Sequence, residues 1–578
     1  MSSIAAENYL PSELLLIIFD HLEYGDLYRL TSVSSKFNHL SLIVYFARRK
    51  IVVSPDGRVD LPNAARTMEM LPFIRKAPFV KSINRLSCGL LQPHKSFLEN
   101  ISHLTTILRN VESVEEFVLD FFVAGPESWT PTMIKQAKGG TGLVSALNEL
   151  FTTAARVSRS VMVRNGTSLR AVLQKADKAN NSTKSWSFGQ VTRLFSEKSS
   201  SKHGKKPPTP VSDAPCISTP SLVSAKGALQ ALEINSIILL SPPFLDWTIR
   251  ALNANEITDL TFGTIEFRDV DWHGVLSQLH IPTLKKLTFR GYTPVRALVD
   301  FTVRHQGITT LAVNNLNLDD WYTIRPSSPS DNGDASSKLA KAFTNVKSLT
   351  CCPQGLAILL SPMLFQGKTL SPTSTRDNIT ATSTTPDIFP NLRAISVIWS
   401  ISIGQQLKMS IIGDILEPVA HKFKSYERVT FAVTYRADAG ASWRAPVIPV
   451  PAQISRGLQG GNSLVVSTSP SSGYSGANAA ATGTAAQSHP LFTYFTKIKL
   501  EVTPRADKEG VADFVKGLAE ALTCVKRIDV DTRSKAGRFA QENRSMKVLF
   551  CYHILTQFKK LQAVYIDGVR SKLTGCTE

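Results

Sequence analysis

Several residue clusters in this chain carry side chains that catalyse reactions or bind metals in other proteins, and each cluster is incomplete. Residues 139–142 are rich in glycine, but the lysine and the serine or threonine of a phosphate-binding loop do not follow them. Cys351 and Cys352 lack a second cysteine pair at zinc-site spacing. Cys551 and His553 lie close together, but no third group that would orient the histidine accompanies them.

Two further polar groups are also explained without catalysis. His273 and His280 are seven residues apart beside apolar residues, which is typical of a helix surface. Asp529 and Asp531 share one face of an expected strand, without the further acidic residues that a metal site needs. We therefore expect a non-catalytic protein that binds no cofactor and no metal. An active site assembled from distant loops would leave no local pattern and stays open at this point.

Apolar side chains recur at helical spacing in residues 10–40. Leu14, Ile18 and Leu22 are four residues apart, and Pro11 suits a first helical turn, where its missing N–H costs nothing. This spacing predicts a short helix that is apolar on much of its surface.

Two further short helices are expected in the same segment. Gly25-Asp26 is expected to break the first helix, with Asp26 as the cap of the second, and Ser34 is expected to cap the third. About 40 residues rarely bury enough apolar surface to fold alone, so the segment should dock on another surface. That surface is either a partner protein or the rest of this chain.

The order of residues in this segment resembles an F-box, and the resemblance covers residues 9–50. Phe37 stands where many F-boxes carry tryptophan, a change that keeps an aromatic side chain. The residues that carry the resemblance are Leu10-Pro11, Glu13-Leu14-Leu15, Ile18-Phe19, Leu22, Asp26-Leu27, Leu30, Val33-Ser34 and Phe37.

The resemblance implies a function for the whole chain. F-boxes bind a Skp-family adaptor, which links them to the cullin of an SCF-type ubiquitin ligase, and the remainder of the chain then holds a protein substrate. Some matching residues must instead form the core of the small domain, and the sequence does not divide the two sets. Those expected to form or support the adaptor contact are Leu10, Pro11, Leu14, Ile18, Leu22, Leu27, Leu30, Val33 and Ser34.

A second pattern, apolar-x-x-apolar-x-apolar, recurs along the rest of the chain. Amphipathic helical patterns lie between its copies, and alternating strands and helices imply parallel strands with crossover helices. The copies start at residues 229, 257, 284, 308, 346, 392, 426, 495, 525 and 561, with a further copy at 114.

The spacing of these copies resembles that of leucine-rich repeats. Starts at 229, 257, 284 and 308 are 28, 27 and 24 residues apart, but other gaps are longer, up to 69 residues between 426 and 495. The usual asparagine or cysteine at the ninth repeat position is also missing. The expected α/β fold is a three-helix F-box followed by an irregular leucine-rich-repeat-like solenoid with long disordered loops. An ordinary open α/β sheet is the alternative.

Polar residues at the third and fifth repeat positions are expected on the concave face of such a solenoid. Basic residues gather there toward the C-terminal end, which favours an acidic protein target. Ordinary solvated strand positions explain any single one of them equally well. The candidates for target binding are Lys286, Arg428, Lys497, Lys499 and Arg527.

The formal net charge of +19 and the pI of about 9.6 indicate an anionic partner. Residues 1–50 are balanced, so the excess lies in the remainder of the chain. The alternative function is therefore a scaffold without ligase activity, whose basic face binds nucleic acid or an acidic protein. The sequence favours protein over nucleic acid, because no aromatic-plus-basic recognition motif is present.

Composition divides the chain into four expected parts. The Ser-, Pro- and Gly-rich stretches among them cannot bury enough surface to offset the entropy of ordering. The parts are an F-box at 9–50, a helical or early repeat region at 51–176, a disordered basic linker at 177–226 and a leucine-rich-repeat-like, substrate-binding array at 227–578 with disordered insertions at 325–338, 366–387 and 436–490.

The seven cysteines show no paired spacing, which indicates a reducing compartment. No apolar run approaches the length of a membrane span, and no signal peptide is visible. We expect a protein of the cytoplasm, the nucleus or both, with no membrane contact.

Overall fold

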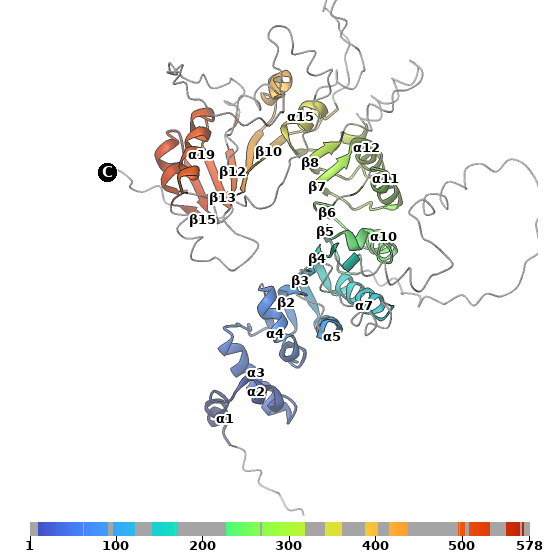
Figure 1. Cartoon of the computed structure of the whole chain (residues 1–578), viewed down its shortest axis with the longest axis vertical. Coiled ribbons are helices and arrows are strands. Elements are labelled where there is room, and N and C mark those ends of the chain that lie inside the picture. The colour runs from blue at the N-terminus through green and yellow to red at the C-terminus, as the bar shows by residue number, and fades with distance from the viewer. Residues whose placement is uncertain are drawn as a thin grey trace, which may run out of the picture. The chain divides into compact units, whose positions relative to one another are not determined.

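The computed structural model describes the chain in segments that fall into two compact units, Met1–Arg325 and Pro326–Glu578 (Figure 1). The disordered stretches expected at 177–226, 325–338, 366–387 and 436–490 lie outside these segments, apart from Arg436, which ends a strand. The described residues are 10–121, 141–170, 227–317, 341–360, 388–402, 415–436, 495–531 and 549–571, apart from short gaps at 62, 91–95, 168, 266, 268, 496, 503–507, 550 and 567–568.

Three short helices open the first unit: α1 (Ser12–Phe19), α2 (Tyr24–Leu30) and α3 (Ser35–Arg48). Ser34 caps α3 as predicted, because its hydroxyl accepts a hydrogen bond from the backbone N–H of Phe37 at 3.2 Å. The prediction for Asp26 is wrong. The helix break comes earlier, and Asp26 lies in the first turn of α2, where a carboxylate is also favourable.

Arg48 explains why α1 ends where it does. Its guanidinium donates hydrogen bonds to the backbone carbonyls of Phe19 at 3.0 Å and Leu22 at 2.6 Å, and to that of Asp20. It also pairs with the Asp20 carboxylate at 3.2 Å. The last carbonyls of a helix lack partners within the helix, so this side chain from α3 satisfies the end of α1 and fixes the two helices together.

Aromatic packing joins the three helices to the first helix of the array, α4 (Ala64–Arg75). The ring of Tyr45 in α3 stacks on Phe73 with the centroids 3.5 Å apart, and Phe46 meets Phe79 edge to face. Burial raises the pKa of Tyr45 to about 12. The Arg49 guanidinium lies 3.0 Å from the Glu69 carboxylate. The helices are therefore held against the array by side-chain packing as well as by the chain connection.

Eight strands of the first unit lie in sequence order, and each is parallel to the next. They are β1 (Arg58–Leu61), β2 (Ser82–Gly89), β3 (Ser113–Phe121), β4 (Ser158–Asn165), β5 (Ala231–Asn235), β6 (Asp259–Phe262), β7 (Lys286–Pro294) and β8 (Thr310–Asn317).

Helices follow these strands and lie along one side of them (Figure 1). Alternation of the strands accounts for this arrangement: Leu232 and Ile234 in β5 are buried, whereas Glu233 between them is partly exposed. The helices are α5 (Ser96–Asn110), α7 (Thr141–Val157), α10 (Leu245–Ala254), α11 (Asp269–Gln278) and α12 (Val295–Arg304), with a 3-10 turn, η4, at Ile237–Leu240.

The second unit repeats the same plan. Six of its strands are parallel in sequence order, and β15 (Val569–Ser571) returns antiparallel to the last of them. The six are β9 (Ser348–Cys351), β10 (Ala394–Ser402), β11 (Arg428–Arg436), β12 (Lys497–Val502), β13 (Arg527–Asp531) and β14 (Ala563–Ile566). The helices are α15 (Pro353–Leu360), α17 (Ala420–Phe423) after the 3-10 turn η7 (Glu417–Val419), and α19 (Lys508–Ala521).

The predicted repeat pattern is confirmed by strand positions and register. Each strand from β5 to β14 begins at the third position of one sequence copy. The third positions of consecutive copies pair directly, as in Asp259 with Lys286 and Lys286 with Thr310. The units are therefore built from leucine-rich-repeat-like strands and helices.

Four strands lie within residues 51–176, the expected helical or early repeat region, and two of them precede the copy recognised at 114. The strand β2 keeps the pattern, because Ile83, Leu86 and Cys88 are buried and pair with Val114, Phe117 and Leu119 of β3. In β4 the first position of the copy is polar: Ser158 stands there and is buried.

Candidate partner-binding surfaces

Exposed large apolar side chains are concentrated at the start of the chain. Nine such residues are exposed in the described part, and eight of them lie between residues 10 and 52. The array has almost none, since its apolar side chains are buried between strands and helices. The nine are Leu10, Leu14, Ile17, Ile18, Tyr24, Val33, Ile43, Val52 and Tyr552.

Helix α1 has apolar residues on both of its faces. Leu15 and Phe19 are buried against the other helices, and Phe19 meets Phe37 edge to face at 5.6 Å. Leu14 and Ile18, four residues apart, share a second face about 100° around the helix and are 47% and 45% exposed. A helix that is apolar all round is normally buried all round, so this face of α1 lacks a cover in the isolated chain.

The structure divides the nine predicted adaptor-binding residues into three groups. Leu27 is completely buried between the helices and belongs to the core of this small domain. Leu22 and Leu30 are half-buried. The remaining six are exposed: Leu10, Pro11, Leu14, Ile18, Val33 and Ser34. The hydroxyl of Ser34 is also engaged in capping α3.

Ile17 belongs to this surface and was not among the predicted residues. It is 58% exposed and lies three residues after Leu14 on α1. Its i+3 spacing from Leu14 was the available signal. We call the exposed set Leu10, Leu14, Ile17, Ile18 and Val33 the apolar face.

Four of the five predicted target-binding residues lie on consecutive strands of the second unit. Arg428 is in β11, Lys497 and Lys499 are in β12, and Arg527 is in β13. Lys497 pairs with Arg527 in the sheet register. We call these four residues the basic face. Lys286, the fifth, lies in β7 of the first unit, where its ammonium group contacts the Asp259 carboxylate at 2.5 Å.

Asp529 lies within the basic face and was not recognised in the sequence as part of it. Its carboxylate contacts Lys497 Nζ at 2.7 Å and Arg527 Nε at 2.8 Å. Burial alone would raise the pKa of this carboxyl, but hydrogen bonds from Arg527 and Lys497 outweigh it and lower the pKa. The Arg527 guanidinium also lies over the ring of Tyr565, 4.1 Å from its centroid.

Asp529 neutralises only part of the basic face. The four cations and Asp529 sum to +3 at neutral pH, and Glu501 and Asp531 follow at the ends of the same strand faces. Arg428 and Lys499 are exposed and have no carboxylate partner within the described residues. These two side chains are therefore the ones available to an anionic partner.

Burial affects the cysteines of the incomplete catalytic patterns, and His273 of another pattern lies 3.9 Å from the Asp300 carboxylate. Cys351 is completely buried, and burial raises the pKa of its thiol well above the usual value. Burial also raises the pKa of Cys551. No group of three or more His, Cys, Asp and Glu side chains in the described segments is arranged to hold a metal ion. Residues 139 and 140 lie outside those segments.

No helix in the described segments is a candidate for a membrane span. None of them combines the length and the apolar composition that crossing a bilayer requires.

The F-box-like family profile matches residues 8–50, the same segment that forms α1 to α3. No curated protein matches the chain. A solved structure similar to it is the leucine-rich repeat-containing protein LegL7 from Legionella pneumophila, at 12% identity, a TM-score of 0.26 and coverage of 60% of this chain and 87% of LegL7. Another is the complex of Rad7 and Elc1 in yeast, at 10% identity, a TM-score of 0.28 and coverage of 75% of this chain and 91% of the matched one.

The match to residues 8–50 agrees with the boundaries expected from sequence. The parallel strands and helices that follow it agree with the expected repeats. The chain carries an F-box-like domain at residues 8–50, followed by a leucine-rich-repeat-like parallel sheet.

Proposed function

We propose that this chain is the substrate-recognition subunit of an SCF-type cullin–RING ubiquitin ligase. The observation that carries the proposal is the apolar face, which lies within the F-box-like domain and stays exposed in the isolated chain. The apolar face binds a Skp-family adaptor, and the adaptor connects the chain to a cullin. The chain performs no bond chemistry itself.

The energetics of the apolar face support this assignment. Full burial of one large apolar side chain contributes roughly 1.5–3 kcal/mol. The five side chains of the apolar face are between 45% and 61% exposed, so about half of that contribution remains to be gained from each. Covering them would contribute roughly 4–8 kcal/mol before the entropic cost of association is subtracted. Such a surface favours a stable complex over a transient contact.

The connection between the F-box-like domain and the array supports a receptor role. The stacking of Tyr45 on Phe73 and the Arg49–Glu69 ion pair hold the helices against the first repeat. A substrate bound to the array would be tethered to the same complex as the ubiquitin carrier, which raises its effective concentration there. That is the contribution that a non-catalytic receptor makes to ubiquitin transfer.

A reconstituted ligase tests the proposal against an adaptor-bound scaffold without ligase activity. Adaptor, cullin, RING subunit and charged ubiquitin carrier would be combined with the full chain, and ubiquitin on the lysines of the chain itself would be measured. We expect transfer that requires every component. Stable adaptor binding without transfer would contradict the receptor role and support the scaffold.

For the substrate, we propose a protein that presents an acidic segment to the basic face. Arg428 and Lys499 supply charge that Asp529 does not neutralise, and Lys497 and Arg527 add donors from neighbouring strands. Neighbouring strands lie about 4.8 Å apart and alternate side chains of an extended peptide repeat about every 6.7 Å, so long cationic side chains on these strands lie within reach of carboxylates on one side of such a peptide. Lys286 already contacts Asp259, so its contribution is smaller.

Charge reversal on the basic face is expected to weaken acidic-ligand binding about tenfold. Exposed ion pairs contribute roughly 0.2–1 kcal/mol each, and Arg428→Glu with Lys499→Glu replaces two attractions with two repulsions. Poly-L-glutamate would be titrated into the full chain at two salt concentrations, with Lys424→Glu and Lys526→Glu as the matched control. Both control lysines are exposed and lie outside the basic face.

The same titration with duplex DNA tests the alternative function. The net charge of +19 favours nucleic acid as well as acidic protein. Tighter binding of DNA than of poly-L-glutamate, with equal losses in both double variants, would contradict an acidic protein target at the basic face.

A further inference from the structure

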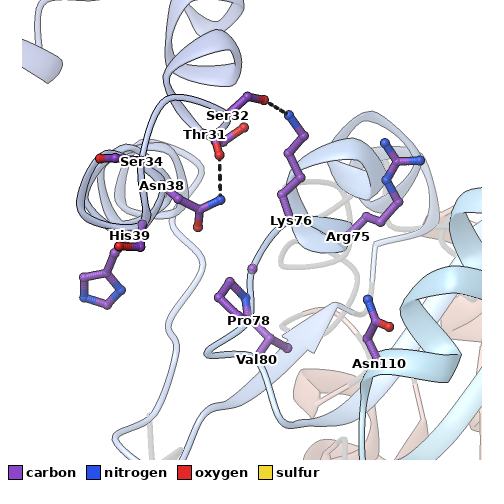
Figure 2. Close-up of a pocket in the computed structure, with 12 residues that line it drawn as sticks. Thr31, Ser32, Ser34, Asn38, His39, Arg75, Lys76, Pro78, Val80 and Asn110 are labelled. Carbon is purple, nitrogen blue, oxygen red and sulfur yellow. Dashed lines mark hydrogen bonds between the residues drawn. The ribbon is translucent and has the colours of Figure 1, made fainter.

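A cavity of about 710 Å³ lies where the F-box-like domain meets the first repeat. One wall is the turn between α2 and α3 with the start of α3, which supplies Thr31, Ser32 and Asn38. The opposite wall is the end of α4 and the segment before β2, which supplies Arg75 and Lys76, and Asn110 closes the cavity from the end of α5 (Figure 2). Small-molecule sites typically have volumes of about 300–1,000 Å³.

The lining of this cavity is positively charged. It includes an arginine and a lysine, several hydroxyl and amide groups, and no aspartate or glutamate. Lys76 Nζ donates to the hydroxyl of Ser32 at 2.6 Å and lies 4.1 Å from the centroid of the Tyr28 ring. Neither contact removes its charge, and the ammonium group retains two further N–H donors.

The positive charge of Arg75 is likewise not neutralised by its hydrogen-bond partner. Its Nη1 lies 3.0 Å from Nδ1 of His103. Burial, followed by the charge of Arg75, lowers the pKa of His103, so the imidazole is neutral at pH 7 and accepts this hydrogen bond. Glu99 lies beyond the other ring nitrogen of His103, at 3.5 Å. The guanidinium therefore faces a neutral partner and retains four further N–H donors.

Amide groups on both walls add further donors to the cavity. Asn38 uses one amide N–H on the backbone carbonyl of Thr31, at 2.8 Å, and has a second N–H to donate. Asn110 is exposed at the rim. The cavity thus combines two cationic side chains from the end of α4 with amide and hydroxyl donors from both walls (Figure 2).

We propose that this cavity binds a small polyphosphorylated ligand. A phosphate oxygen accepts charge-assisted hydrogen bonds from arginine and lysine, and the hydroxyl and amide groups supply further donors. The volume exceeds that of a single phosphate group, which points to a ligand with several of them. Because the cavity is walled by both the F-box-like domain and the first repeat, the ligand links the two and stiffens their connection. This inference does not depend on adaptor binding.

Calorimetric titration of inorganic tripolyphosphate into the full chain at low ionic strength tests the proposal. We expect saturable binding that weakens as salt is added. Replacing both cations, with Arg75→Gln and Lys76→Gln, is expected to weaken binding by at least about tenfold, because several charge-assisted hydrogen bonds are lost. The matched control is Arg156→Gln with Lys285→Gln, two exposed cations of the same unit that do not line the cavity. It is expected to bind within about twofold of the unchanged chain.

Lys76 also contacts Ser32 and Tyr28, so its replacement could weaken ligand binding by altering the local structure. A second variant that leaves both cations in place distinguishes the two causes. Asn110→Asp places a carboxylate at an exposed position of the rim, where the fold tolerates it, and is expected to weaken binding by repulsion. Absence of binding to the unchanged chain would overturn the proposal. So would equal losses in the cavity and control variants, or an Asn110→Asp variant that binds as tightly as the unchanged chain.

Discussion

Replacing Leu14 and Ile18 with aspartate is expected to abolish binding of the chain to a Skp-family adaptor. The two side chains are neighbours on α1 and are 47% and 45% exposed, so the substitutions leave the core of the domain intact. In a complex, each carboxylate would replace a buried apolar group and would itself be desolvated without a partner. A loss of more than about 100-fold in affinity follows from those two costs. Pull-down and calorimetry with the purified adaptor would measure it.

Val52→Asp provides the matched control for this experiment. Val52 is the most exposed of the large apolar residues, at 82%, and lies outside the matched residues 8–50. The same chemical change there is expected to leave adaptor affinity within about twofold. Circular dichroism would confirm that both variants keep their helices. Retention of adaptor binding by the Leu14→Asp and Ile18→Asp double variant would contradict the assignment of the apolar face.

Leu27→Ala is expected to destabilise the F-box-like domain by about 2–5 kcal/mol, because it opens a cavity in a small core. Leu27 is 0% exposed and lies between the three helices. Any loss of adaptor binding in this variant would follow from loss of structure. Hydrogen exchange of the amides in α1 to α3 would report the local free energy of opening.

Leu14→Ala is the comparison for Leu27→Ala. The same truncation at this half-exposed position of α1 is expected to change stability by less than about 1 kcal/mol while weakening adaptor binding. Comparison of the two variants would thus distinguish an effect on the stability of the domain from an effect on adaptor affinity. Equal exchange protection in the two variants would show that Leu27 is not a core residue.

The repeats were predictable because their sequence pattern coincides with what each strand must bury. The fourth and sixth positions of a copy point into the same core, so apolar residues recur there, as at Leu260 and Phe262. The pattern failed in β4, where Ser158 is buried at the first position of the copy. In β2 it holds, since Arg85 is at the third position and lies 3.4 Å from Glu116 on the next strand.

The F-box-like segment was predictable in extent but not in the roles of its residues. Local rules identified the Ser34 cap, because a cap depends on neighbouring backbone groups. They failed for Asp26, because the break after α1 depends on the guanidinium of Arg48, about 28 residues further along the chain. Whether a leucine of this segment is buried, as Leu27 is, or exposed, as Leu14 is, likewise depends on how the three helices pack.

The strand positions of the basic residues were predictable, and their ion pairs were not. Alternation placed Arg428, Lys497 and Lys499 on one face, and the register brings Arg527 beside Lys497. The neutralising role of Asp529 depends on that register, since its carboxylate contacts cations from its own strand and from the neighbouring one. Spacing within a single strand does not contain this information.

The affinity between the purified full chain and a purified Skp-family adaptor tests the central claim most directly. The exposed apolar side chains within residues 8–50 predict a saturable one-to-one complex, with a negative heat-capacity change because apolar surface is buried. Calorimetry at several temperatures would measure both quantities. Absence of binding by a correctly folded chain, or binding that the Leu14→Asp and Ile18→Asp variant retains, would contradict a ligase receptor whose apolar face engages the adaptor.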